Sequence, residues 1–383
     1  MKRAGCMVMV LFVLVGLFVM PAAAVDMDIQ AKSAVLMDVA TGTLLYESQA
    51  HTPLAPASVT KVMTMLLIME AIDSGRIGWN DTVTASETAA AKGGSQIYLK
   101  VGETMSVADM VKSIAVSSAN DCACAMAEHI AGSESAFVEQ MNARAKALGM
   151  NDTHFVNCTG LDDSDEAKDH KTSAFDIALM SRQLLKHHPD IKKYTTIWMD
   201  TVRGGSFGLS NTNKMVRFYQ GCTGLKTGFT SEAGYCLSAS AQREDMELIA
   251  VVMGCESSQT RFAACKSLLD YGFANFGLVT PQMPQQASVP VKLGTQDEVL
   301  AIAGDENALL IDKAQKSSVT TEIQLEPEVS APVSKGQRLG TMTVKAGQQI
   351  LAQIPLVAAE PVGRLTWWQI FGRILRQLAL GTE

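Results

Sequence analysis

The sequence predicts an α+β fold, in which an antiparallel sheet flanked by helices precedes a small all-β region and a terminal amphipathic helix. Three observations carry this prediction. Strand-like segments stand at both ends of the first 277 residues, with helical segments between them and no parallel strand-helix-strand alternation. Prolines and short alternating segments follow, and an apolar stripe of helical period closes the chain.

The composition is that of a globular protein with a sizeable core. The chain has 383 residues, of which 47% are hydrophobic and 19% charged, and its formal net charge is −7. This length favours two domains or one large one. The negative charge argues against nucleic acid as a partner.

Residues 1–24 have the pattern of a secretory signal peptide. Lys2 and Arg3 form a basic start, residues 7–20 are apolar, and Ala22–Ala24 supplies small residues for cleavage. We therefore expect an exported protein whose mature chain begins near residue 25. An uncleaved N-terminal anchor is the alternative, because signal and anchor patterns overlap.

The segment 25–277 is expected to form one domain whose strands lie early and late and whose helices lie mainly between them. Strands are predicted from alternation at 34–38, 43–47, 235–242 and 247–254. Helices are predicted from apolar residues spaced by three and four at 58–73, 107–117, 121–131, 137–148, 173–187 and 259–276.

Two further parts follow this domain. Residues 278–358 are rich in Val, Thr and Gln, with alternating runs such as 287–293 and 319–325, and predict a small β-sandwich-like domain. Residues 361–380 predict an amphipathic helix that has Trp367 on an apolar stripe, three arginines off the stripe and a pair of tryptophans beside the arginines. Such a helix is typical of a membrane interface; docking on the protein's own surface is the alternative.

Three short motifs occur once each and in one order: Ser58-x-x-Lys61, Ser118-x-Asn120 and Lys226-Thr227-Gly228. Each motif alone is common. Together they supply the parts of a serine acyl-transfer site in which lysine is the base. The motifs therefore predict a reaction class.

Ser58 and Lys61 lie three residues apart at the start of a predicted helix, so their side chains share one face. A serine hydroxyl needs an adjacent base, and lysine serves as one only when its amine is neutral. Burial or a neighbouring cation lowers the pKa of a lysine, and Lys226 is the candidate cation. Ser118 is a candidate proton relay, and Asn120 a candidate partner of the Lys61 amine or of the substrate amide.

The third motif fits the edge of a strand and is expected to hold the substrate. Lys226 adds positive charge, and the hydroxyl of Thr227 can bond a carboxylate. Gly228 is expected to let the substrate backbone approach closely. The N–H groups of Ser58 and Phe229 are the expected oxyanion hole.

Seven cysteines follow the predicted signal, an odd number that cannot pair completely within one chain. None has zinc-like C-x-x-C spacing, and we expect most to be small buried residues. We expect no metal and no cofactor. These cysteines are Cys122, Cys124, Cys158, Cys222, Cys236, Cys255 and Cys265.

The motifs and their surroundings resemble the low-molecular-mass penicillin-binding proteins, specifically the serine-type D-alanyl-D-alanine carboxypeptidases. The likeness covers about residues 28–277, and the two downstream parts also fit. The segments that carry it are 56–64, 117–121, 157–162, 221–234 and 268–273.

This resemblance implies a transpeptidase/β-lactamase-like domain with a five-stranded antiparallel sheet, a β-rich second domain and a C-terminal membrane anchor. It implies removal of the terminal D-alanine from peptidoglycan stem peptides that end in D-Ala-D-Ala, through an acyl-enzyme on Ser58. It also implies covalent inhibition by β-lactams and a location on the outer face of the cytoplasmic membrane. Arg261 matches an arginine near the substrate carboxylate; a solvated surface charge is the alternative.

Three other functions use the same motif types. A class A β-lactamase also needs a glutamate for deacylation, and no Glu-x-x-x-Asn segment lies between Ser118 and Lys226. A peptidoglycan endopeptidase or transpeptidase differs only in the shape of its substrate. A non-catalytic β-lactam sensor or cell-wall binder is the remaining alternative.

Overall fold

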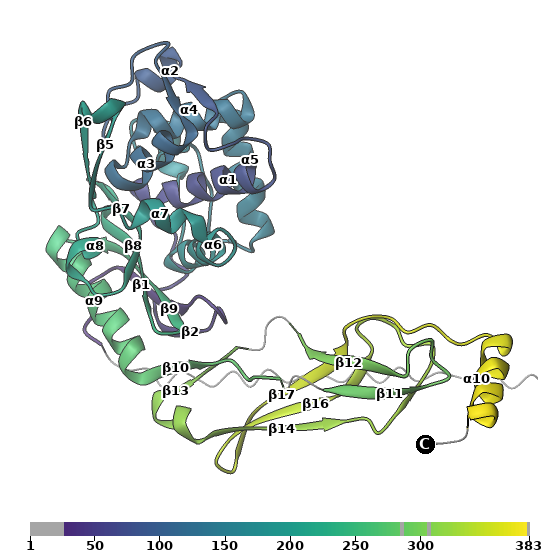
Figure 1. Ribbon diagram of the computed structural model, residues 1–383. Helices are drawn as coiled ribbons and strands as arrows, with labels where there is room; N and C mark the ends of the chain where they lie inside the picture. Colours follow the sequence, from purple (N-terminus) through teal and green to yellow (C-terminus); the bar gives the residue numbers. More distant parts are fainter. Residues whose placement is uncertain (1–26, 284–286, 305–307, 381–383) are drawn as a thin grey trace, which may run out of the picture.

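The computed structural model describes residues 27–283, 287–304 and 308–380, so the predicted signal peptide lies outside the described residues. Figure 1 shows two units: an N-terminal unit of helices around a sheet, and an elongated β-rich unit. Helix α9 leads from the first unit into the second, and helix α10 lies at the end of the β-rich unit that is farthest from the other helices.

A five-stranded antiparallel sheet forms the centre of the N-terminal unit, in the order β2-β1-β9-β8-β7. The expected sheet is confirmed. Only β7 was not predicted as a full strand, because its two glycines and polar residues lower its strand propensity. The strands are β1 Ser33–Asp38, β2 Leu44–Ser48, β7 Cys222–Thr230, β8 Gly234–Arg243 and β9 Met246–Cys255.

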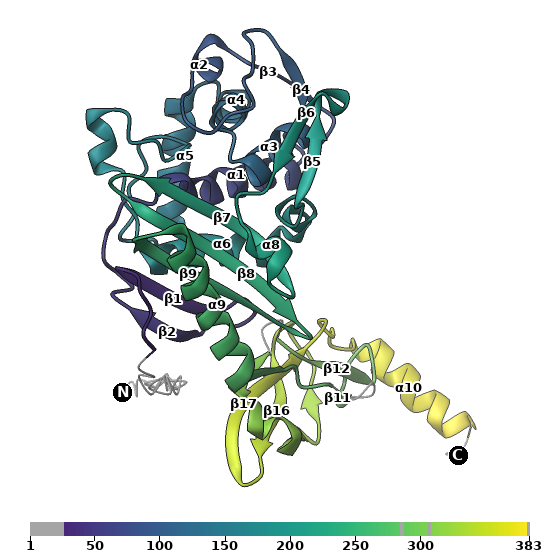
Figure 2. The same cartoon turned by 90° about the vertical axis from the view of Figure 1, so that its left-hand side faces the viewer.

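Both faces of this sheet are covered by helices, as Figure 2 shows. Along β9, Ala250 and Val252 belong to the core that α9 covers, whereas Ile249 and Val251 belong to the core of the helical block. All four side chains are fully buried. Each buried aliphatic side chain of this size contributes about 1.5–3 kcal/mol, so the two packed faces fix the register of the strand.

Helix α1, Lys61–Asp73, runs through the middle of the helical block, and ten of its thirteen residues are buried. A helix that is apolar on all sides is a core helix. The predicted helix at 58–73 divides in two, because residues Ala57–Thr60 form a 3-10 turn before α1 begins. The other helices are α2 Glu87–Ala90, α3 Val107–Ser117, α4 Asn120–Ala131, α5 Glu134–Ala147, α6 Ala174–His187, α7 Lys192–Thr195, α8 Met215–Phe218 and α9 Ser258–Asn275.

Serine side chains cap five of these helices by accepting a backbone N–H of the first turn, which fixes where each helix begins. Ser133 caps α5 in this way, so the helix begins three residues before the predicted start at 137. Two small two-stranded antiparallel sheets complete the unit: β3 Thr82–Thr84 with β4 Thr104–Ser106, and β5 Met199–Val202 with β6 Phe207–Ser210. Further 3-10 turns are Asp165–Asp169, Pro189–Ile191, Arg203–Gly205 and Lys313–Ser318.

The β-rich unit holds a six-stranded sheet in the order β14-β16-β17-β12-β11-β15 and a two-stranded ladder of β10 and β13. Its core is aliphatic, with residues such as Val289, Met342 and Leu356 fully buried. The predicted all-β character of this region is confirmed. The strands are β10 Phe276–Val279, β11 Ser288–Lys292, β12 Glu298–Ala303, β13 Leu309–Asp312, β14 Val319–Leu325, β15 Val329–Ser330, β16 Arg338–Ala346 and β17 Gln349–Ala358.

Helix α10 spans Trp367–Leu380 and so begins six residues later than the sequence predicted. The side chains of Thr366 and Gln369 each accept the other's backbone N–H, which is a capping box that starts the helix. Residue Val362 before it pairs with Val333 of the β-rich unit. Among the described residues, no helix is both long and apolar enough to cross a membrane.

Candidate active site

Ser58 and Lys61 meet where the 3-10 turn passes into α1. The Nζ of Lys61 donates to Ser58 Oγ at 2.9 Å and to the carbonyl of Thr159 at 2.8 Å. Lys61 is fully buried at the first position of α1. The amine of the predicted base therefore touches the hydroxyl of the predicted nucleophile.

Burial lowers the pKa of Lys61 from 10.5 to about 7, although Cys158 and Asp121 act in the opposite direction. A large share of this lysine is therefore neutral near pH 7, as a general base must be. Of the two causes expected from the sequence, burial or a neighbouring cation, burial dominates. Burial, followed by the nearby charges of Lys61 and Arg261, also holds the pKa of Lys226 well below its usual range.

Ser118 occupies the joint between α3 and α4 in a left-handed conformation, with φ of 64°. A residue other than glycine adopts this conformation only at a cost, so the surrounding structure imposes it. Its Oγ is buried and has no hydrogen-bond partner among the described residues. A buried hydroxyl without a partner costs stability, and such groups concentrate at sites that receive a ligand or a proton.

Asn120 begins α4 and holds the preceding loop in place. Its Nδ2 donates to the carbonyl of Gly93 at 2.7 Å, and its N–H donates to Ser95 at the same distance. Its Oδ1 is buried without a partner among the described residues. The expected bond to Lys61 is absent, because the Lys61 amine points to Ser58 and Thr159 instead. The Oδ1 remains available for the other expected partner, the amide of a substrate.

The Thr159 carbonyl is a site group that the sequence did not predict. Asn157 Oδ1 accepts the N–H groups of Thr159 and Gly160, and this forms the turn that presents the carbonyl. A Cβ on Gly160 would stand 1.9 Å from the carbonyl oxygen of Ala57, so only glycine lets the turn press onto the nucleophile segment. The Asn-x-Thr-Gly sequence indicates a turn, but not that its carbonyl anchors a lysine.

Strand β7 passes the nucleophile at contact distance. A Cβ at Gly228 would lie 2.5 Å from the carbonyl oxygen of Pro56 and 3.1 Å from the backbone nitrogen of Ser58. In the structure, the close approach at Gly228 is that of the protein's own 3-10 turn. The expected approach of a substrate backbone stays a prediction. The Lys226-Thr227-Gly228 motif therefore packs directly against the Ser58 segment.

The other residues of the third motif lie on the same strand. Lys226 is buried, and its Nζ donates to the carbonyl of Thr227 at 2.9 Å. The Oγ1 of Thr227 donates to Thr212 Oγ1 at 2.8 Å. Phe229 is half exposed, and its ring packs on Tyr235 with the ring centres 4.3 Å apart. The motif thus ends in a half-exposed aromatic residue at the edge of the sheet.

Arg261 supports this strand from the opposite face. It is buried on α9, and its Nη1 donates to the carbonyl of Gly228 at 2.9 Å. Its guanidinium lies over the rings of Tyr235 and Phe262, at 5.3 and 4.9 Å from their centres. The alternative of a solvated surface charge is wrong. Arg261 is a buried support directly behind the third motif.

The cysteines belong mainly to the packing around the site, although Cys158 also acts to raise the pKa of Lys61. Six of the seven are buried and all seven are free thiols, which confirms the expectation that most are small buried residues. Burial raises the pKa of Cys255 to about 12, which makes its thiol inert. Within the described ranges, no group of three His, Cys, Asp or Glu side chains is arranged to hold a metal ion.

Comparison with known proteins agrees with this geometry. Residues 20–257 match the family described as D-alanyl-D-alanine carboxypeptidase, and residues 282–364 match the C-terminal domain of penicillin-binding protein 5. The D-alanyl-D-alanine carboxypeptidase DacF of Bacillus subtilis is 44% identical over 337 residues, which cover 86% of this chain and 85% of that protein.

Two solved structures are similar as well. Penicillin-binding protein 5 from Haemophilus influenzae superposes with a TM-score of 0.75 at 31% identity, covering 89% of this chain and all of that one. Penicillin-binding protein D2 from Listeria monocytogenes, solved in its ampicillin-bound form, gives 0.57 at 31% identity, covering 65% of this chain and 99% of that one. The chain thus belongs to the serine D-alanyl-D-alanine carboxypeptidases, within the low-molecular-mass penicillin-binding proteins.

Proposed function

We propose that this protein releases the terminal D-alanine from peptidoglycan stem peptides ending in D-Ala-D-Ala, through an acyl-enzyme on Ser58. One observation carries the proposal. A fully buried lysine, with its pKa lowered to about 7, donates to the Ser58 hydroxyl at 2.9 Å. This is the arrangement that a serine nucleophile with a lysine base requires.

Acylation follows from this contact. Neutral Lys61 takes the proton of Ser58 Oγ, and the oxygen attacks the carbonyl carbon of the penultimate D-alanine. The N–H groups of Ser58 and Phe229 stabilise the negative charge on the tetrahedral oxygen. The packing of Gly228 against the 3-10 turn brings these two backbone segments close together. The C–N bond then breaks, and the leaving D-alanine takes a proton that Lys61 delivers through Ser118. Losing one oxyanion donor costs about 3–4 kcal/mol of barrier.

Deacylation reverses the same steps with water in place of the amine. Lys61 takes a proton from the water, the ester to Ser58 breaks, and Ser58 regains its proton. The amine of Lys226 and the hydroxyl of Thr227 bind the terminal carboxylate of the substrate. The buried, unpartnered Oδ1 of Asn120 supports a role in accepting a substrate N–H.

A β-lactam would acylate Ser58 by the same attack, with its ring amide in place of the peptide bond. The ampicillin-bound relative supports this part of the proposal. The β-lactamase alternative lacks support, because no Glu-x-x-x-Asn segment is present between the second and third motifs. Endopeptidase activity on cross-linked peptides remains the second candidate, since it needs the same nucleophile.

We propose in addition that the protein is exported and peripheral on the outer face of the cytoplasmic membrane. Trp367 and Trp368 are 86% and 85% exposed, and Phe371 is 55% exposed. An uncovered stripe of this kind supports insertion of α10 into a membrane interface. Arg373 is paired with Asp297 at 2.7 Å, so one of the arginines holds the helix to the β-rich unit.

The anchor is tested by cosedimentation with anionic lipid vesicles. A chain truncated after Leu365 keeps the pairing of Val362 with Val333 and should lose vesicle binding while retaining activity. A truncated chain that still sediments with vesicles would contradict the anchor. The double variant Trp367→Ala/Trp368→Ala, which keeps the helix, should weaken binding in the same direction.

The activity is tested by release of D-alanine from diacetyl-Lys-D-Ala-D-Ala. The wild type should release it, and Ser58→Ala should release none. If penicillin labels Ser58 while this peptide and pentapeptide stems stay intact, the sensor alternative replaces the proposal. If only cross-linked dimers are cleaved, the endopeptidase alternative does.

A further inference from the structure

A second cleft lies outside the active site, between α8 and α9 on the face of the sheet opposite the helical block. It measures about 610 Å³. This volume is typical of sites that bind small molecules. No residue of the three motifs lines it. Its lining consists of Lys214, Met215, Phe218, Tyr219, Ser258, Gln259, Phe262, Ala263 and Lys266.

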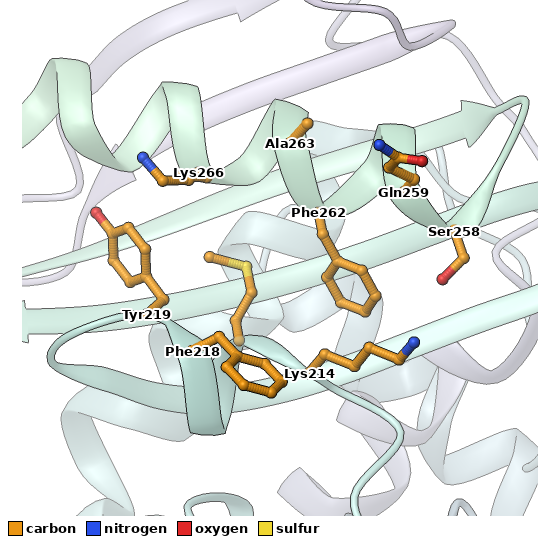
Figure 3. Close-up of a pocket in the computed structure, with 9 residues that line it drawn as sticks. Lys214, Phe218, Tyr219, Ser258, Gln259, Phe262, Ala263 and Lys266 are labelled. Atoms are coloured by element: carbon orange, nitrogen blue, oxygen red, sulfur yellow. The ribbon is translucent and has the colours of Figure 1, made fainter.

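The floor of the cleft is aromatic. Figure 3 shows the rings of Phe218 and Phe262 pointing into the space between the two helices. Phe218 is 74% exposed, and exposed apolar patches mark sites of interaction. Aromatic rings favour an occupant with a flat apolar body, because stacking adds to the burial of area.

The two ends of the cleft differ in charge. Figure 3 shows Lys214 and Ser258 at one end and Lys266 with the Tyr219 hydroxyl at the other. The charge of Lys266 is matched by Asp270 at 2.6 Å, whereas the ammonium of Lys214 has no ion-pair or hydrogen-bond partner within the described part of the chain. Among the described residues, no acidic side chain lines the cleft. The end at Lys214 therefore complements a single negative charge.

We propose that this cleft is a second binding site for a small amphipathic anion, with an aromatic or aliphatic body over Phe218 and Phe262 and a carboxylate at Lys214. The site is joined to the catalytic one by three contacts. The Phe262 ring lies beneath the guanidinium of Arg261, Arg261 holds the carbonyl of Gly228, and Gly228 packs against Ser58. An occupant that shifts Phe262 is thus linked to the reactivity of Ser58.

Binding is tested by fluorescence titration of the full chain with 4-(1-pyrenyl)butyrate, compared with 4-(1-pyrenyl)butanol, which has the same body without the charge. Ala263 is exposed and lines the cleft, so Ala263→Trp should fill the cleft and weaken binding at least tenfold. Ala274→Trp is the matched control, because Ala274 is exposed on the same helix but lies outside the cleft. Equal binding to the wild type and to Ala263→Trp would place the probe elsewhere, for example on α10, and overturn the proposal.

The preference of the cleft for an anion is tested by the difference in affinity between pyrenylbutyrate and pyrenylbutanol. The carboxylate should bind about two- to fivefold tighter than the alcohol, as expected for one exposed ion pair. Lys214→Gln should remove this difference, while Lys335→Gln, an exposed lysine of the β-rich unit, should leave it intact. Equal affinities for the two probes in the wild type would overturn the anionic specificity.

The link to the active site is tested by the rate at which a fluorescent penicillin acylates Ser58. Saturating pyrenylbutyrate should change this rate severalfold in the wild type and in Ala274→Trp, and not in Ala263→Trp. An unchanged rate in the wild type would overturn the link. This readout rests on the proposed acylation of Ser58, whereas the titrations do not, so failure of one is distinguishable from failure of the other.

Discussion

The two units of this protein differ in what they bury. The N-terminal unit encloses charged and polar side chains, with Lys61 and Lys226 almost completely buried and Arg261 only 7% exposed. In the β-rich unit, within the described ranges, no charged or polar side chain is buried to a comparable degree. Its core holds only residues such as Val289 and Leu339.

This difference indicates that the N-terminal unit carries the catalytic chemistry and that the β-rich unit has a structural role. Burying an amine costs free energy, and an aliphatic side chain in the same place would not. The N-terminal unit bears that cost where the three motifs meet, and the described residues of the β-rich unit include no buried charged side chain. Changes in the first unit should therefore affect acylation more than stability, and changes in the second should do the reverse. The following predictions test that contrast.

The largest effect is expected for Lys61→Met, which keeps the length of the side chain and removes the amine. Acylation by a fluorescent penicillin should fall about 10³-fold, since a general base contributes 10²–10⁴-fold. The melting temperature should stay level or rise, because a buried amine is replaced by an apolar group. A variant that loses stability and activity together would show that Lys61 is structural.

The next largest effect is expected when a glycine in each unit, Gly228 or Gly340, is replaced by alanine. Gly228→Ala places a Cβ 2.5 Å from the Pro56 carbonyl and displaces the nucleophile segment, so acylation should fall about 10²-fold. Gly340→Ala creates a similar clash, 2.4 Å from the Gln324 carbonyl, between two strands of the β-rich unit. It should lower stability by about 1–3 kcal/mol in denaturant titrations and leave acylation unchanged. Equal acylation rates in Gly228→Ala and Gly340→Ala would contradict the proposed difference between the two units.

Arg261→Lys is expected to have a smaller effect. A lysine cannot reproduce a planar group that stacks on two rings while it donates to the Gly228 carbonyl, so acylation should fall about tenfold. Arg243→Lys is the control, because Arg243 also stacks on two rings but at the far end of β8. If both variants acylate at the wild-type rate, Arg261 does not position the third motif.

The smallest effect on activity is expected for Met342→Ala in the core of the β-rich unit. Met342 is fully buried, and the cavity should cost about 2–5 kcal/mol of that unit's stability by calorimetry. The acylation rate at a temperature where both units are folded should not change. A fall in the rate would show that the β-rich unit acts on the active site.

Much of this fold could be predicted because local chemistry and tertiary structure agree. Helix α3 was predicted with its observed bounds, since Ser106 caps it and its apolar residues recur with helical period. Strand β14 alternates and was predicted equally well. Strand β7 was not, because glycine and lysine are poor strand residues. Tertiary contacts with β8, the 3-10 turn and Arg261 hold them extended.

The site could be predicted in its residues but not in its contacts. The motifs give the serine and the lysine, yet the Thr159 carbonyl that holds Lys61 is backbone and has no side-chain signature. The burial of Arg261 and the packing of Gly228 on Ser58 depend on segments far apart in sequence. Spacing within one helix predicts neighbours on that helix, whereas these contacts join a helix, a turn and a strand.

The central claim is that a buried Lys61, a large share of which is neutral near pH 7, is the base that activates Ser58. The acylation rate of Ser58 by penicillin, measured from about pH 5 to about pH 9, tests it most directly. Because burial lowers the pKa of Lys61 to about 7, the neutral fraction grows as pH rises through that value. The rate should therefore rise with an inflection near 7 and then level off, and Lys61→Met should remove this dependence. A rate that is flat through pH 7 in the wild type, or an inflection that survives in Lys61→Met, would contradict the claim.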